Sequence, residues 1–227
     1  YDEDELKKAE SYYEKALKLN PNSEIVLLDL ALVLELQKKP KRAMDIYQKA
    51  LTLNPQSAQV RKRLGRFYLE QKQLDDALVQ YRELEKVESD PQETRVKISL
   101  IYREKGEYQK AETELNMVLA AQPQNDRARY FLGAVHTENK EYDKAVATLS
   151  DIKETSEYYP DARMYLSYAY QRQGKIAEAI VEAEKALVVK KDDLDLLGFL
   201  SSLHREKGDR SKAIELLEKM ITLAPER

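Results

Sequence analysis

Two histidines, His136 and His204, are the side chains best suited to acid–base chemistry or to binding a metal ion. Catalysis would also need a nucleophile or a second acid–base group nearby, and a zinc site would need two or three further ligands. Both histidines stand at positions that leucine and tyrosine occupy elsewhere in a repeating pattern. We therefore interpret them as residues of a helical core and expect no metal site.

The remaining candidates for chemistry are acidic clusters and glycines. The clusters at 2–5 and 190–193 suit the starts of solvated helices, where carboxylates face the positive end of the helix dipole. The six glycines are isolated, so no glycine-rich phosphate loop is present, and the chain has no cysteine to act as a nucleophile or thiolate ligand. We expect no cofactor and no enzymatic activity from these residues.

Composition narrows the classes of partner. Of 227 residues, 42% are hydrophobic and 35% are charged, and 38 basic against 41 acidic side chains leave a net charge of −3. This balance favours neither a polyanion nor an anionic membrane as partner. A cysteine-free chain suits the cytosol and the bacterial periplasm equally. Because the first residue is Tyr1 rather than Met, we expect a segment of a longer protein.

The sequence repeats with a period of 34 residues. An alanine recurs at this spacing without insertion at Ala9, Ala43, Ala77, Ala111, Ala145, Ala179 and Ala213. Each of the last six is preceded, 13 residues earlier, by a large apolar residue, and a small residue follows that one directly: Leu30-Ala31, Leu64-Gly65, Ile98-Ser99, Leu132-Gly133, Leu166-Ser167 and Leu200-Ser201. The small residues allow two helices to approach closely. Three residues further on stand Leu34, Tyr68, Tyr102, His136, Tyr170 and His204.

This spacing predicts pairs of helices. Apolar residues three and four apart form one face of a first helix. Glycine or proline then ends that helix, as in 38–40, 104–106, 172–174 and 206–208. The alanine belongs to a second helix, which ends near Pro21, Pro55, Pro123 or Pro225.

The 34-residue helix–turn–helix unit, with its Leu64-Gly65 to Tyr68 stripe, its alanine and its closing proline, resembles the tetratricopeptide repeat over essentially the whole chain. The resemblance implies an all-α fold, a right-handed superhelical α-solenoid of antiparallel helix pairs. The segment 158–163 looks like long bacterial multi-repeat arrays, some of which are envelope lipoproteins. The chain lacks the tryptophan that is frequent in the family. Arginine often occupies that position, at Arg61, Arg95, Arg129 and Arg163. We expect each arginine to lay its aliphatic part along the next helix and to keep its guanidinium in water.

In this register the chain divides into an unpaired second helix and six repeats within one continuous solenoid domain. The predicted bounds are 1–23 for the leading helix, then 24–57, 58–91, 92–125, 126–159, 160–193 and 194–227. The polar junction at 153–160 either bends the array or is a frayed helix end whose two tyrosines pack on a neighbour. The last helix is expected to leave its apolar side chains uncovered, at Ala213, Ile214, Leu217 and Met220.

The family resemblance implies that the first helix of each repeat lines a concave groove. Reading the inward positions gives a basic segment followed by a tyrosine and methionine segment, which suits a peptide with apolar and acidic groups. The predicted partner-binding residues are Lys62, Arg66, Arg103, Tyr130, Met164, Tyr168 and Arg205. In the alternative interpretation, Tyr130 and Tyr168 only fill space between helices.

We therefore expect a non-enzymatic scaffold that binds a protein or peptide, as a segment of a larger assembly protein. Three alternatives stay open. The repeats could recruit substrate for a catalytic domain outside this chain, or the exposed terminal helices could associate with one another. An RNA-binding array of helical pairs is disfavoured, because the net acidity does not suit a nucleic acid partner.

Overall fold

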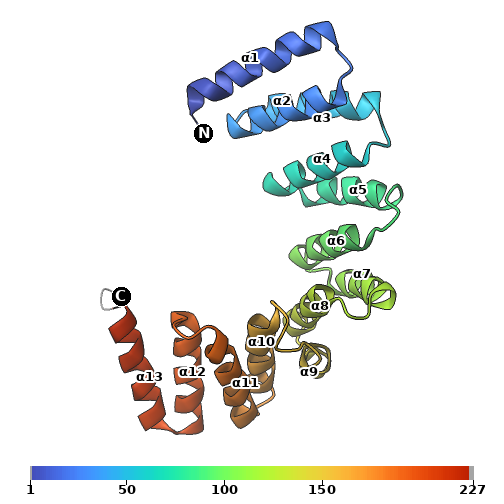
Figure 1. The fold of residues 1–227 in the computed structure, drawn as a ribbon. Helices are drawn as coiled ribbons and strands as arrows, with labels where there is room; N and C mark the ends of the chain where they lie inside the picture. Colours follow the sequence, from blue (N-terminus) through green and yellow to red (C-terminus); the bar gives the residue numbers. More distant parts are fainter. Residues whose placement is uncertain (1, 225–227) are drawn as a thin grey trace. The chain divides into compact units, whose positions relative to one another are not determined.

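The computed structural model describes residues 2–224, and within this range the chain forms helices joined by short connections, without strands (Figure 1). This confirms the predicted all-helical fold. The chain divides into two compact units, Tyr1–Ile101 and Tyr102–Arg227, and the division falls inside α6. The helices are α1 (Glu3–Leu19), α2 (Glu24–Leu36), α3 (Pro40–Leu53), α4 (Ala58–Glu70), α5 (Leu74–Glu85), α6 (Gln92–Glu104), α7 (Tyr108–Ala121), α8 (Asp126–Glu138), α9 (Tyr142–Ser150), α10 (Tyr159–Arg172), α11 (Ile176–Val189), α12 (Leu194–Lys207) and α13 (Arg210–Leu223).

Side-chain caps fix where several of the first helices begin. The Ser57 hydroxyl accepts a hydrogen bond from the amide of Val60, 3.2 Å away, at the start of α4. Asn125 and Asp193 cap α8 and α12 in the same way. Five helices begin at the first residue of a predicted repeat, and α10 begins one residue early, at Tyr159. The division into repeats itself stays a prediction.

The turn inside each helix pair contains one residue with a left-handed backbone. These residues are spaced 34 apart, with φ between 57° and 91°: Lys38, Lys72, Gly106, Lys140, Gly174 and Gly208. Glycine adopts this conformation without a steric cost, whereas lysine does not. Of the four breaks named from the sequence, three have glycine at this position, whereas the first has Lys38, and lysine also stands there in the two turns that were not named. Pro40 in particular begins α3 instead of ending α2.

Replacing Lys72 by glycine should stabilise the protein. Lys72 has φ 58° and an exposed side chain, so Lys72→Gly relieves backbone strain while costing little in lost contacts. We expect the free energy of unfolding to rise by about 0.5–1 kcal/mol in urea denaturation followed by circular dichroism. The reciprocal variant Gly106→Ala, whose new methyl group would meet nothing within 4 Å, should lose a similar amount. A loss of stability in Lys72→Gly would contradict this explanation.

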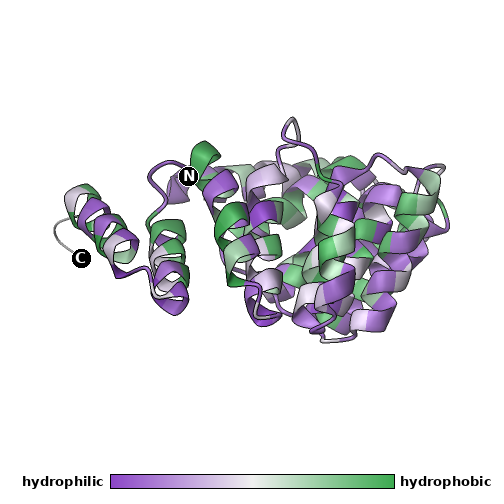
Figure 2. Ribbon diagram, turned by 90° about the horizontal axis from the view of Figure 1, so that it is seen from below, coloured by the Kyte–Doolittle hydropathy of each residue, from purple (hydrophilic) through white to green (hydrophobic). Residues whose placement is uncertain are grey.

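In the first unit, the core forms between consecutive helices. α2 contacts α1, α3 and α4, and α4 contacts α5. The buried side chains of this core include Leu27, Leu30, Leu34, Tyr47, Leu64 and Phe67. The structure explains why a small residue is needed at Gly65: a Cβ atom there would lie 3.0 Å from the ring of Tyr81. Figure 2 shows hydrophobic and hydrophilic residues alternating along single helices, as expected for amphipathic packing.

The second unit is built in the same way, by contacts between successive helices from α7 to α13. One cluster buries Leu149, Ile152, Tyr159, Ala162 and Leu166, and another surrounds Ala179, Ala183 and Leu200. α8 also contacts α10 directly. The first helices α8 and α10 of two neighbouring pairs therefore lie side by side, which brings residues about 34 positions apart onto one surface. Within residues 2–224, no helix combines the length and the apolar character that crossing a membrane would require.

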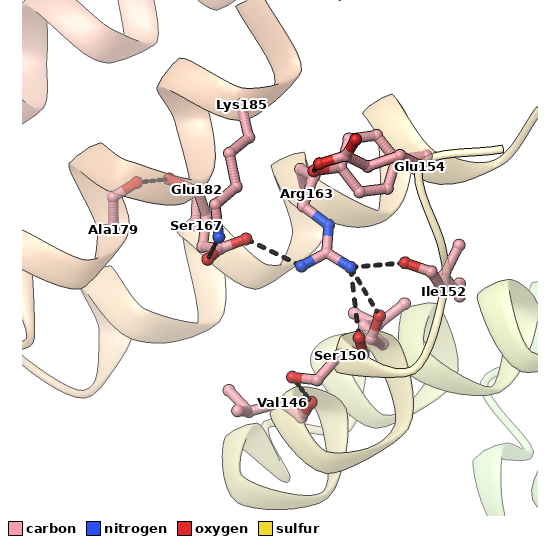
Figure 3. A network of polar contacts seen from close by, with 11 residues as sticks. Val146, Ser150, Ile152, Glu154, Arg163, Ser167, Ala179, Glu182 and Lys185 are labelled. Atoms are coloured by element: carbon pink, nitrogen blue, oxygen red, sulfur yellow. Dashed lines mark hydrogen bonds and ion pairs between the residues drawn. The ribbon is translucent and has the colours of Figure 1, made fainter. Parts of the chain in front are cut away.

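The arginine column binds the end of the preceding helix. Arg61 and Arg129 donate hydrogen bonds to the carbonyl oxygens of Pro55 and Pro123, both at 2.6 Å. Arg163 is only 7% exposed, so the prediction of a solvated head group is wrong there. Its guanidinium donates to the carbonyl oxygen of Ile152 at 2.7 Å and to Glu182 at 3.0 Å (Figure 3). The first of these bonds satisfies the carbonyl oxygen of Ile152, which follows the short helix α9.

The polar junction at 153–160 is short and packed. α9 ends at Ser150, and two tyrosines precede and open α10. Tyr158 stacks on Tyr130, with ring centroids 5.4 Å apart, and Tyr159 lies under the guanidinium of Arg163 at 4.6 Å. Both tyrosines therefore pack on neighbours, as one of the two interpretations expected. Whether the junction bends the array stays a prediction.

The last described helix, α13, is covered on one side. Ile214 and Leu217 are exposed, as predicted, and so is Ile221, whereas Met220, also expected to be uncovered, is partly buried. Ala213 was expected to be uncovered but is buried, because α13 packs on α12 here; the hydroxyl of Ser201 on α12 also donates a hydrogen bond to its carbonyl oxygen at 3.0 Å. Self-association through this helix stays a prediction.

Candidate functional site

The seven predicted partner-binding residues lie in separate places. Lys62 and Arg66 are exposed on α4 in the first unit. In the second unit, Arg103 and Tyr130 belong to one polar and aromatic cluster, Met164 and Tyr168 line a pocket, and Arg205 lies on α12. The strongest candidate site is therefore in the second unit, on α8 and α10.

Arg66 is engaged by neighbouring carboxylates. Its guanidinium lies 3.5 Å from Glu35 on α2 and 3.4 Å from Glu70 on its own helix. Burial raises the pKa of Glu35, and the Tyr47 hydroxyl donates a hydrogen bond to the same carboxylate. A partner's acidic group would have to compete with these contacts, so Arg66 is a weaker candidate than its position in the sequence suggested.

Arg103 is also held inside the protein. Its Nε lies 3.0 and 2.9 Å from the two carboxylate oxygens of Glu138 on α8, and its Nη2 lies 3.4 Å from the hydroxyl of Tyr165 on α10. A bidentate contact of this kind fixes both side chains. Arg103 therefore ties the end of α6 that belongs to the second unit to α8 and α10, and it neutralises Glu138 at the edge of the pocket described below.

Tyr130 is part of an aromatic cluster. Its ring contacts those of Phe131, Tyr158 and Tyr165, with centroids 5.2–5.7 Å apart. Burial and the neighbouring Tyr165 raise the pKa of Tyr130 to about 12. These contacts match the space-filling interpretation, so Tyr130 supports the wall of the site rather than offering a free contact surface.

The pocket itself has a volume of about 480 Å³ and a mainly apolar lining, and it lies between α8, the start of α9, and α10. Its walls comprise Thr137, Glu138, Lys140, Tyr142, Met164, Tyr165, Tyr168 and Arg172. Tyr168 is 40% exposed and meets Tyr142 edge-on, with centroids 6.5 Å apart. Two cations and one carboxylate line the pocket, and Arg103 already binds that carboxylate. The arrangement suits a ligand that has an apolar side chain next to a negatively charged group.

Of the lining residues, the predicted binding set contained Met164 and Tyr168, and four others lie outside the inward-facing positions that the sequence indicated: Glu138, Lys140, Tyr142 and Arg172. Only first-helix positions at fixed intervals were read as inward-facing, and none of these four occupies one of them. Lys140 belongs to the turn and Tyr142 to the first residue of α9. The sequence did contain an indication for Lys140. It lies 34 residues from both Gly106 and Gly174, which mark the turn after each first helix.

Arg205 lies at a second, separate pocket of about 380 Å³ between α12 and α13. Small residues, Gly198, Ser201 and Ser202, form its α12 side, and Ile214 and Leu217 form its α13 side. The structure therefore does not bring Arg205 together with Met164 and Tyr168 in one pocket.

Known proteins resemble this chain in sequence pattern and in structure. Models of the tetratricopeptide repeat match residues 34–97 and 102–157, and further models of the same repeat match residues 1–58 and 196–227. No curated protein matches the chain. The C-terminal part of a repeat-containing protein from Cytophaga hutchinsonii shares 17% identity at a TM-score of 0.79, covering 98% of this chain and 92% of that one.

Two further solved structures share the fold. A tetratricopeptide repeat protein from Parabacteroides merdae is 19% identical, with a TM-score of 0.69 over 96% of this chain and 87% of its own. MamA from Desulfovibrio magneticus RS-1, from residue 41 to its end, is 22% identical, with a TM-score of 0.68 over 75% of this chain and 96% of its own. At these identities the likeness concerns the fold alone. With the repeat models matching more than half of its residues, the chain belongs to the tetratricopeptide repeat family.

Proposed function

We propose that this chain is a non-enzymatic interaction scaffold and that it binds a peptide segment of a partner protein in the pocket between α8 and α10. The observation that carries the proposal is the tyrosine and methionine lining, with the exposed Tyr168 and the partly buried Met164 on α10 opposite Tyr142. Aromatic side chains supply a large contact area at a small cost in conformational entropy, and they dominate many binding interfaces.

The charges around the pocket favour a particular kind of peptide. Lys140 and Arg172 line the pocket, and the Arg103 guanidinium contacts both carboxylate oxygens of Glu138. The remaining field is positive, so an incoming acidic side chain gains favourable interactions there. The occupant we propose is therefore a segment with an aromatic or long aliphatic side chain flanked by aspartate or glutamate.

Truncating Tyr168 should weaken this binding. A random peptide library displayed on phage would be selected against the chain, and the recovered peptides would be measured by fluorescence anisotropy. Tyr168→Ala removes an exposed wall of the pocket and should lower affinity by about 5–30-fold, the effect of a loss of about 1–2 kcal/mol at an interface hot spot.

The matched control is Tyr12→Ala on α1, where a tyrosine 68% exposed lies far along the chain from the pocket. It should bind the selected peptides with unchanged affinity. Tyr168 is a better test than Tyr130, because removing Tyr130 also breaks its stacking on Tyr158 and Tyr165. Selected peptides without acidic residues, or with equal affinity for Tyr168→Ala and the unchanged chain, would contradict the proposal.

A further inference from the structure

His136 has two carboxylates beside it. The imidazole is 3% exposed, and its Nδ1 lies 3.1 Å from a carboxylate oxygen of Glu141, the residue that precedes α9. The carboxylate of Glu112, on α7, lies close to both of these side chains. One ligand atom from each of the three residues lies within 4.8 Å of the other two. Successive helices thus supply the additional ligands that sequence reasoning did not find around this histidine.

We propose that Glu112, His136 and Glu141 form a binding site for a divalent transition-metal ion of the zinc class. One imidazole nitrogen and two carboxylate oxygens are ligands that such ions accept, and a water molecule can complete a four-coordinate shell. The ligands come from α7, from α8 and from the residue that precedes α9, so a bound ion would link three consecutive helices of the second unit.

Lys144 shows that the site attracts a cation. Its ammonium group lies 3.1 Å from Glu141 and 3.5 Å from Glu112, and thus bridges the two carboxylates. The lysine side chain is 53% exposed and can swing into water when a metal ion replaces it. Competition with Lys144 should therefore weaken metal binding.

His204 can be compared with His136 within the same chain. This histidine lies two repeats later in the same column, and its Nδ1 is 3.5 Å from Asp209, which replaces Glu141. The position that corresponds to Glu112 holds Ile180, a buried core residue. His204 thus has one carboxylate partner from this set instead of two, so we expect it to bind metal ions far more weakly.

The test is isothermal titration of the tag-free chain with zinc chloride. We expect one saturable site. Glu112→Gln and His136→Gln should each lower its affinity about tenfold or more, since even residues that only support metal ligands cost 10–100-fold. Lys144→Ala should raise the affinity several-fold, and His204→Gln should leave it unchanged. Zinc should also raise the thermal midpoint of the unchanged chain but not that of Glu112→Gln.

Glu112→Gln keeps the shape of a partly exposed side chain, so it tests the site even if His136→Gln disturbs the core. Circular dichroism of both variants would show that the helices are retained. The proposal is overturned if the unchanged chain shows no saturable zinc binding. It is also overturned if binding survives Glu112→Gln at full strength, or if His204→Gln abolishes it.

Discussion

Replacing Arg163 by methionine should destabilise the second unit by about 3 kcal/mol, the loss that follows when one partner of a buried ion pair is removed. The guanidinium donates to Glu182 and to the carbonyl oxygens of Leu149 and Ile152. Methionine fills a similar volume but donates no hydrogen bond, so the carbonyl oxygen of Ile152 would lose its donor, whereas that of Leu149 keeps the amide of Ile152 at 3.2 Å. Lys185, 2.7 Å from Glu182, still neutralises that carboxylate and keeps the loss near the lower end of the range.

Arg61→Met is the matched control. Arg61 occupies the same column and also binds the end of the preceding helix, through Pro55. Its contacts with that carbonyl oxygen are exposed, so water can replace the lost donor, and we expect a loss of about 1 kcal/mol or less. Urea unfolding of both variants, followed by far-ultraviolet circular dichroism, measures the two losses. Equal losses of unfolding free energy in the two variants would show that the burial of Arg163 does not add to its contribution to stability.

The Arg163 network also shows which parts of the structure a sequence can predict. The 34-residue period predicts the helix pairs, because each pair depends on residues three, four and 34 positions apart, and the same spacing recurs in every repeat. The arginine column was visible in the same way. The buried network of Arg163 was not, because α9 ends early, at Ser150, and so leaves carbonyl groups for Arg163 to bind. That depends on how one particular helix ends.

The candidate site was predicted less completely for a related reason. The positions of Met164 and Tyr168 follow from the register of the first helices, and both line the pocket. The pairing of Arg103 with Glu138 depends on side-chain conformations across 35 positions of sequence, which a column of residues does not reveal. The convergence of Glu112, His136 and Glu141 likewise involves three elements whose side chains meet only after folding.

Gly133→Ala tests the closest approach of two helices in the second unit. An added Cβ atom would lie 2.2 Å from Cγ and 2.3 Å from Cδ2 of Leu149, a side chain that is 0% exposed. Neither atom can move into open space, so α8 and α9 must separate or Leu149 must leave its rotamer. Overpacking of this kind typically costs about 1–3 kcal/mol, and we expect a loss at the upper end.

Two further variants separate steric overlap from any general effect of the substitution. Gly198→Ala on α12 places its methyl group 3.4 Å from the flexible end of Met220, an ordinary contact. Since alanine favours a helix over glycine by about 1 kcal/mol, Gly198→Ala should be neutral or stabilising. The double variant Gly133→Ala with Leu149→Ala should be more stable than the two separate losses predict, because the new methyl group enters the space that Leu149 vacates. Additive losses in urea unfolding would mean that Leu149 is not what requires glycine at position 133, and the small-residue column would then need a different explanation.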